Sequence, residues 1–308
     1  MISASAGANM RGLCVLLALV VATPVGAVSP IRTQHDQTRP LPDSAPFIAQ
    51  ARAHLKTDRE LLSHYTFHER QAEIHLTKLG KLTTGAVKVY EVYPGLDPDD
   101  TYRRLIEIDG KPRDPAELDK EDRKHRERIL EELRKREHES PADREKRLRR
   151  EEKRRLETEA ALDDLLRVYN FTLVERQRLN GHSTIVVDFA PRPDAAPKTD
   201  DGALMKKIKG RAWISEDDYQ VARVQIEMLD DLSIRGFLGK LYEGTTASFE
   251  RRKINNEVWL PVEARFNGSG RALIRKFHID TVVEYSDYRK FSVQTDTDFV
   301  LPKRPGGS

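Results

Sequence analysis

Residues 210–224 read GRAWISEDDYQVARV, and the next five residues, QIEML, extend the second half of this stretch to position 229. Within residues 220–229, apolar side chains occupy every second position: Ala222, Val224, Ile226 and Met228. This alternation predicts a β-strand with one apolar and one wet face. Acidic residues at 216–218 separate it from a second strand candidate at 208–214, so we expect the two segments to pair as antiparallel strands.

A second alternating segment, residues 273–285, places its apolar side chains on one face: Leu273, Phe277, Ile279, Val283 and Tyr285. Further segments are rich in β-branched and aromatic residues, which favours strands. They cover residues 65–76, 85–93, 101–108, 168–175, 184–190, 247–254 and 258–266. Three typical turn sequences predict hairpins between successive segments: Asn180-Gly181, Asn255-Asn256 and Gly268-Ser269-Gly270.

Helical signals occur in two parts of the chain. Apolar residues between 45 and 64 follow a helical stripe, which predicts one amphipathic helix before the first strand. A charged insertion at 114–167 contains Asp114-Pro115 and Ser140-Pro141, each a capping side chain followed by proline at the first helical position. These signals predict two helices, at 115–138 and 141–167, with a hinge at Ser140.

The insertion is unusually polar, with sixteen basic and sixteen acidic residues between positions 114 and 159. Acid-before-base pairs four residues apart stabilise isolated helices by roughly 0.2–0.5 kcal/mol each. The insertion contains Asp122/Arg126, Glu131/Lys135, Glu132/Arg136, Glu145/Arg149 and Glu151/Arg155. We therefore expect it to face water, either as a solvated helical arm or as a surface at 114–164 that binds another protein.

The first 27 residues have the pattern of a secretory signal peptide. Arg11 precedes an apolar run at 13–21, and a small-residue cleavage site follows at 25–27. The apolar run is about half the ~20 residues that a membrane span needs, so we expect export and cleavage instead of anchoring. The single cysteine, Cys14, lies inside this run, so the mature chain would carry no disulfide.

The remaining chain divides by composition. A polar, Pro-rich leader at 28–44 is expected to be flexible, as is the tail at 301–308. Between them, we expect one domain at 45–300, interrupted by the charged insertion at 114–167.

Charge and motif content exclude several classes of function. The chain carries 53 basic and 50 acidic residues, a balance that argues against nucleic acid as a partner. The mature chain has no cysteine nucleophile, no Gly-x-Ser-x-Gly, no His-Glu-x-x-His and no phosphate-binding glycine loop. His64 and His68 are four residues apart, but the chain changes from helix to strand between them. We therefore expect no enzymatic activity, no cofactor and no metal site.

The pattern as a whole predicts a mainly β protein with helices, in the α+β class. Its centre would be an open, curved antiparallel half-barrel sheet, with the 45–64 helix as a lid and the charged helices inserted as an arm. One short helix covers little of a sheet with so many strands. Either the sheet curls on itself or an apolar cavity remains.

The order of these elements resembles the LolA-like family of outer-membrane lipoprotein-sorting proteins. A signal peptide, a helix ending in LLSHYTF at 61–67 and a long β-meander follow that order. The hairpin at 210–224 is similar to the family's Trp-containing hairpin, and VWLP at 258–261 and EYSDYRKF at 284–291 look like its C-terminal part. The resemblance covers roughly residues 46–291 without the charged helices. It implies an incomplete barrel with a helical lid over an apolar cavity.

The resemblance also implies a function. We expect a soluble periplasmic protein that shields lipid or lipoprotein acyl chains by burial alone, with only transient membrane contact. The candidate cavity residues are Trp213, Val224, Ile226, Met228, Phe277 and Ile279. The family uses an arginine near the cavity mouth to hold its lid, and Arg103 or Arg104 is the corresponding candidate. The alternative is an envelope interaction or sensor module that uses the charged arm.

Overall fold

The computed structural model describes residues 34–35, 39–55, 57–76, 82–96, 101–234, 239–272 and 275–291. The signal peptide and the 301–308 tail predicted above lie outside these residues, as does most of the leader. The helices are α1 (Ser44–His54), α2 (Asp58–Leu62), α3 (Pro115–Glu137), α4 (Pro141–Val168) and α5 (Asp200–Met205). Within the described part of the chain, no helix is both long and apolar enough to cross a bilayer.

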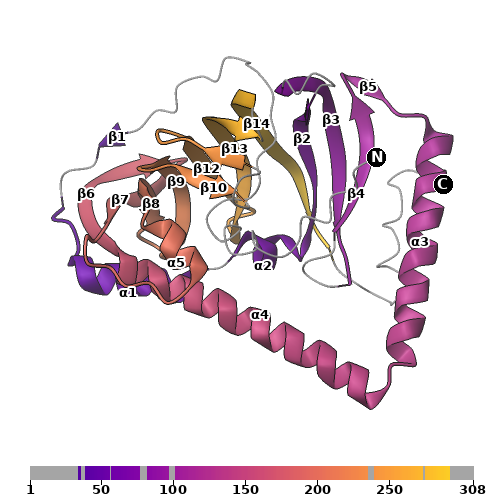
Figure 1. The fold of residues 1–308 in the computed structure, drawn as a ribbon, viewed down its shortest axis with the longest axis horizontal. Helices are drawn as coiled ribbons and strands as arrows, with labels where there is room; N and C mark the ends of the chain where they lie inside the picture. The colour runs from indigo at the N-terminus through magenta and orange to yellow at the C-terminus, as the bar shows by residue number, and fades with distance from the viewer. Residues whose placement is uncertain are drawn as a thin grey trace.

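The strands form one antiparallel sheet (Figure 1). They are β1 (Gln34–His35), β2 (Tyr65–Leu76), β3 (Leu82–Pro94), β4 (Thr101–Ile108), β5 (Lys111–Pro112), β6 (Tyr169–Leu179), β7 (His182–Pro191), β8 (Ile208–Ser215), β9 (Val221–Met228), β10 (Leu232–Ile234), β11 (Gly239–Leu241), β12 (Thr246–Ile254), β13 (Val258–Ala272) and β14 (Arg275–Lys290). Their order in space is β1-β6-β7-β8-β9-β12-β13-β14-β2-β3-β4-β5, with β10 and β11 attached beside β13. The sheet is open, because its edges at β1 and β5 do not pair, and this confirms the predicted fold class.

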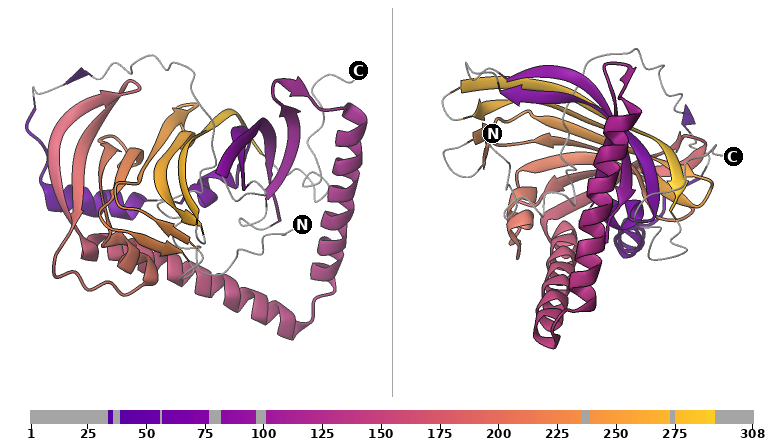
Figure 2. Two further views of the ribbon diagram at one scale, coloured as in Figure 1. Left: turned by 45° about the horizontal axis from the view of Figure 1, so that its top comes forward. Right: turned by 90° about the vertical axis from the view of Figure 1, so that its right-hand side faces the viewer.

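The helical arm, which we define as α3 and α4 together, joins the two ends of this sheet. It leaves the chain after β5 at one edge and returns at β6 near the other edge. In Figures 1 and 2, α3 runs beside β4 and the C-terminal end of α4 lies below β6 to β8. The arm therefore links the two ends of an open sheet, as well as projecting from it.

The predicted caps and hinge of the arm are confirmed. The Asp114 side chain accepts a hydrogen bond from the Ala116 amide at 2.7 Å, and Ser140 Oγ accepts one from the Asp143 amide at 3.1 Å. Each cap satisfies a backbone donor at a helix start, and proline follows it in both cases. These caps explain why two separate helices form in a segment that consists mostly of charged residues and has few apolar ones.

Two predictions about local structure are wrong. Gly268-Ser269-Gly270 forms no turn and lies inside the long strand β13. The single helix expected at 45–64 is two helices, because α1 ends at His54 and Leu55 has extended backbone angles. The predicted Asn180-Gly181 and Asn255-Asn256 turns are present, with the positive φ angles that such hairpins need.

The main hydrophobic core lies between α1 and the β6 to β9 end of the sheet. Phe47, Ile48 and Ala51 of α1 are buried against strand residues of this region. Those residues include Ile185, Val187, Ile208, Ala212, Ile214, Ile226 and Met228. Fully burying one such side chain contributes roughly 1.5–3 kcal/mol, so this contact fixes α1 on one face of the sheet.

The two faces of the sheet can be named from this core. The inner face carries Ala212 and Ile226 and packs against α1. The outer face carries the intervening side chains, such as Arg211 and Gln225. Residues directly opposite each other in an antiparallel ladder share a face, so the register assigns the other strands as well.

Candidate functional site

A row of partly exposed apolar side chains continues the inner face beyond the core. Ile226 of β9 lies opposite Ala247 of β12, which lies opposite Phe266 of β13, and Phe266 in turn lies opposite Thr281 of β14. All four side chains therefore point to the inner face. Because side chains alternate along a strand, the odd-numbered residues 277–285 of β14 are on the inner face too. We call five half-buried members of this surface the inner apolar strip: Phe249, Phe266, Phe277, Ile279 and Tyr285. Thr281 and Val283 lie in the same row of β14 and are fully buried.

Glycines in β13 make room for the aromatic rings of the strip. Phe277 lies directly opposite Gly270, and a Cβ on Gly270 would be only 2.6 Å from the Phe277 ring. A Cβ on Gly268 would be 3.0 Å from the ring of Phe266. Glycine inside a strand weakens it but permits this close approach and local bending. The GSG sequence is therefore used for packing and curvature inside the strand.

A polar cluster lies at one end of the strip. Tyr285 is directly opposite Glu69 of β2, which is opposite Tyr90 of β3. Arg103 of β4 donates a hydrogen bond to the Glu69 carboxylate, and its guanidinium carbon lies 4.4 Å from the centre of the Tyr90 ring. We call Glu69, Tyr90 and Arg103 the polar end of the strip.

Burial determines the protonation behaviour of the polar end. Burial of the carboxyl raises the pKa of Glu69, and the neighbouring Arg103 only partly offsets this. Burial also raises the pKa of Tyr285 above its usual value, as does the nearby Glu69 charge. Tyr285 therefore stays neutral at any physiological pH, while Glu69 is easier to protonate than an exposed glutamate.

The structure separates the predicted cavity residues. Phe277 and Ile279 belong to the strip, and Val224 is on the same face. Ile226 and Met228 also point inward but are buried in the core with α1. Trp213 is on the outer face, where its indole N–H donates to Gln177 at 2.8 Å. Neither of two pockets in the described part of the chain is lined by all six.

The two arginine candidates for holding a lid point to opposite faces. Arg103 points inward and pairs with Glu69. Arg104 points outward, where it bonds Glu91 at 3.0 Å and Asp122 of α3 at 3.0 Å. Among the described residues, neither bonds α1 or α2. Arg104 instead fastens α3 to the sheet, together with a hydrogen bond from Tyr102 to Asp122.

Other arginines, which sequence reasoning did not find, hold α1 and α2. Arg52 of α1 bonds both Glu159 and Asp163 of α4 at 2.8 Å. The largely buried Arg251 of β12 bonds Asp58 of α2 at 2.6 Å. The partners in these pairs are more than a hundred residues apart in sequence, so no local spacing could have revealed them.

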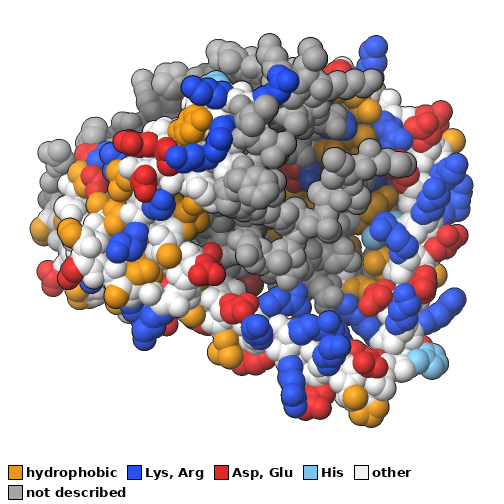
Figure 3. Space-filling view, viewed as in Figure 1, with side chains coloured by type: hydrophobic (Ala, Val, Ile, Leu, Met, Phe, Trp, Pro, Cys, Tyr) orange, Lys and Arg blue, Asp and Glu red, His pale blue; other side chains and the backbone are white. Residues whose placement is uncertain are grey.

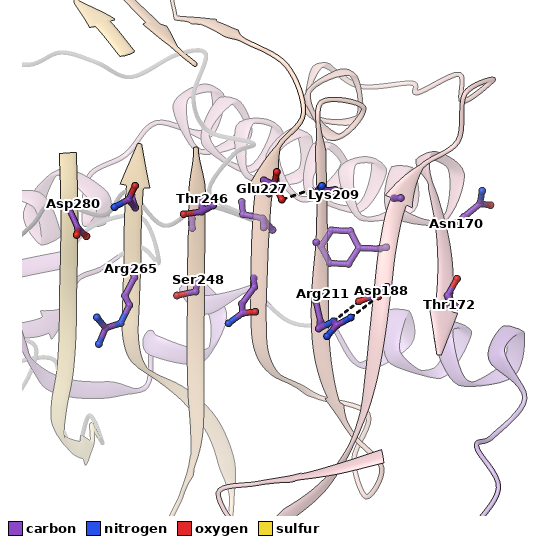
Figure 4. A pocket seen from close by; sticks show the side chains of 17 residues that line it. Asn170, Thr172, Asp188, Lys209, Arg211, Glu227, Thr246, Ser248, Arg265 and Asp280 are labelled. Atoms are coloured by element: carbon purple, nitrogen blue, oxygen red, sulfur yellow. Dashed lines mark hydrogen bonds and ion pairs between the residues drawn. The ribbon is translucent and has the colours of Figure 1, made fainter. Parts of the chain in front are cut away.

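The outer face contains a shallow groove of about 740 Å³ (Figure 4). Polar side chains from several adjacent strands line it, among them Asp188, Arg211, Glu227, Ser248 and Asp280. Arg211 bonds Asp188 at 2.5 Å and Lys209 bonds Glu227 at 3.2 Å. The hydrogen bond from Arg211 lowers the pKa of Asp188. Because cations and carboxylates neutralise each other here, the groove does not favour ligands of one charge.

The helical arm is stabilised by its own ion pairs. Three of the five predicted pairs are present, including Glu145 with Arg149 at 2.5 Å and Glu131 with Lys135 at 2.9 Å. Asp122 pairs instead with Arg104, and Arg155 with Glu152. Figure 3 shows positive and negative side chains mixed along the arm. Leu148 and Leu156 of α4 are also exposed, at 49% and 54%.

The comparisons with known proteins find matches among solved structures only. No family model and no curated protein matches the chain. One similar structure is an outer membrane lipoprotein-sorting protein domain from Vibrio parahaemolyticus, with 11% identity, 82% of this chain and 94% of that chain covered, and a TM-score of 0.31. Another is a DUF1329 family protein from Desulfovibrio piger, which is 13% identical in sequence. The match covers 83% of this chain and 98% of that chain, with a TM-score of 0.26. A third is a LolA superfamily protein from Nitrosomonas europaea, which is 8% identical in sequence. The match covers 82% of this chain and 96% of that chain, with a TM-score of 0.25.

Proposed function

We propose that the protein is a periplasmic binding protein that shields an acyl chain on the inner apolar strip, without covalent chemistry. The observation that carries this proposal is the row of half-buried apolar side chains on the inner face of β13 and β14. Phe266, Phe277 and Ile279 belong to none of the hydrophobic clusters that the described residues form. They are therefore available to a ligand in a way that the core residues under α1 are not.

The strip has a suitable length and chemistry. Tyr285 and Phe277 are eight residues apart on one strand, which corresponds to about 27 Å at ~3.4 Å per residue. An extended acyl chain fits within this span. Removing methylene groups from water contributes ~0.8 kcal/mol each, so about a dozen correspond to roughly 10 kcal/mol before binding costs. Burial of the acyl chain would therefore supply most of the affinity for a lipid.

The secretory signal motivates the cellular setting of the proposal. Export across the inner membrane would deliver the mature chain, from residue 28 onward, to the periplasm. There it would meet lipids and the acyl groups of lipoproteins as cargo. Transfer would require only that the cargo exchanges between this strip and another apolar surface.

A pair of neighbouring residues provides a matched test. Ile279 points to the inner face, whereas His278 points outward, where its Nδ1 lies 3.0 Å from Ser269 Oγ. We expect Ile279→Ser to weaken binding of a fluorescent fatty acid about tenfold or more, and His278→Ser to leave it unchanged. Thermal unfolding of both variants checks that the fold is retained. Equal binding by Ile279→Ser and the parent protein would contradict the proposal.

A second candidate function is a docking surface on the helical arm for an envelope protein. The observation that favours it is the exposure of Leu148 and Leu156 within a helix that is otherwise covered by ion pairs. Binding to such a charged surface should weaken between ~50 and ~500 mM salt, whereas binding of an acyl chain should not. Comparing Leu148→Gln/Leu156→Gln with the parent protein in a pull-down from periplasmic extract at both salt concentrations separates the two functions.

A further inference from the structure

The inner surface is amphiphilic, because it combines an apolar strip with charged side chains near its ends. The strip extends along β14 from Phe277 to Tyr285, and the polar end begins directly beside Tyr285 at Glu69. Charged side chains elsewhere on β14 and β2, such as Glu284 and Arg70, point to the outer face and bond each other at 2.8 Å. Glu69 of β2 and Arg103 of β4 instead point to the inner face, where they bond each other.

Arg103 has hydrogen-bonding capacity that Glu69 does not use. Its Nη2 donates to Glu69, while the other guanidinium nitrogens have no acceptor in the described residues. Its side chain is 41% exposed, although that of Glu69 is only 15% exposed. The ring of Tyr90 supports the guanidinium from one side. A planar guanidinium with free donors matches carboxylate and phosphate groups in geometry and charge.

We infer that the inner surface binds an anionic amphiphile, whose carboxylate or phosphate is held by Arg103 and whose acyl chain lies along the strip toward Phe277. This inference rests on the proposed acyl-binding function and names the chemical class of the ligand. Arg103 places a positive charge beside the apolar row and supplies the complementarity, and Lys88 of β3 points to the same face. A neutral fatty alcohol can fill the strip but leaves the free donors of Arg103 without an anionic partner.

Glu69 acts in this arrangement as an internal competitor for Arg103. The groups that face it are Arg103 on β4, Tyr90 on β3 and Tyr285 on β14, and Asp58 of α2 adds negative charge near Tyr285. An anion that takes Arg103 leaves Glu69 buried without its cation, and the carboxyl then takes up a proton. Replacing Glu69 by glutamine removes the competing charge and should strengthen anion binding.

The experiment measures displacement of a neutral, pyrene-labelled fatty alcohol from the full mature chain by three competitors with the same chain length. These are laurate, dodecyl phosphate and dodecanol. In the parent protein, we expect laurate or dodecyl phosphate to compete at least about tenfold better than dodecanol. Whichever anion competes better identifies a fatty acid or a phosphate-bearing lipid as the source of the head group.

The variants assign this preference to Arg103. Arg103→Gln should abolish it, Glu69→Gln should increase it, and Arg70→Gln, which alters the outer face of the same strand as Glu69, should leave it unchanged. The gain in Glu69→Gln cannot arise from a damaged fold. Equal competition by all three compounds in the parent protein would overturn the inference and leave acyl binding intact. Failure of all three to displace the probe, or failure of the probe to bind, would remove the proposed function as well.

Discussion

Phe277 of β14 lies directly opposite Gly270 of β13, and its ring fills the space that a side chain on Gly270 would occupy. The same relationship occurs at the other end of the sheet, where a Cβ on Gly210 would lie 2.5 Å from the ring of Phe189. Glycine and phenylalanine thus form cross-strand pairs in which the ring covers the neighbouring backbone. One of these pairs positions the end of the inner apolar strip.

The Gly270 pair predicts a combined effect on stability and binding. A Cβ on Gly270 would lie 2.3 Å from the Lys240 carbonyl oxygen and 2.6 Å from the Phe277 ring. Gly270→Ala should therefore displace both and reduce the free energy of unfolding by about 1–3 kcal/mol, the usual cost of overpacking. It should also weaken acyl binding, because Phe277 is displaced. Urea unfolding and probe titration measure both effects. Ser269→Ala, at the adjacent position on the opposite face, is the control and should change neither quantity appreciably.

A buried hydroxyl on β14, in the same row as Ile279 and Tyr285, predicts a stabilising substitution. Thr281 is fully buried on the inner face, and its Oγ1 has no hydrogen-bond partner among the described residues. Thr281→Val should raise the free energy of unfolding by about 1 kcal/mol, because it removes an unsatisfied polar group. Thr184→Val is the matched control, since Thr184 is equally buried but donates to the Gln177 carbonyl at 2.9 Å. That variant should be destabilised, and a loss of stability in both would refute the explanation.

Asp164 of α4 predicts how stability changes in acid. Burial alone would raise its pKa, but hydrogen bonds from Thr199, Arg167 and the Lys198 amide outweigh this and hold the pKa below its usual value. A carboxyl with a lowered folded-state pKa stabilises the protein above its unfolded pKa, near ~3.9, and loses that contribution as pH falls through the folded value. The stability difference between the parent protein and Asp164→Asn should therefore be largest near neutral pH and shrink below about pH 4. A constant difference across this range would contradict the assignment.

Periodicity was sufficient to predict most of the sheet. Residues 65–76 and 101–108 were predicted as strands, and they are β2 and β4 in the structure. Their β-branched and aromatic composition and the flanking turns favoured strands over helices. The capped helices of the arm were equally clear, because proline after a capping side chain is a local signal.

The sequence could not reveal features that depend on distant contacts. Gly268-Ser269-Gly270 has the composition of a turn, and only the close packing of Thr245, Phe266, Phe277 and the Lys240 backbone around the two glycines shows why it continues a strand. Likewise, Arg103 and Arg104 are neighbours in sequence but point to opposite faces, so their different roles follow from the register alone. The contacts of Arg52 and Arg251 with the arm and α2 were missed for the same reason.

The central claim is that an acyl chain occupies the inner face of β13 and β14. Photocrosslinking with a palmitate analogue that carries a diazirine near its methyl end tests this most directly, because peptide mapping by mass spectrometry locates the chain itself. We predict saturable crosslinks to inner-face residues around Phe266, Phe277 and Ile279, which excess palmitate suppresses. Crosslinks in the outer groove around Arg211 or along the helical arm, or no saturable crosslinking, would contradict the account.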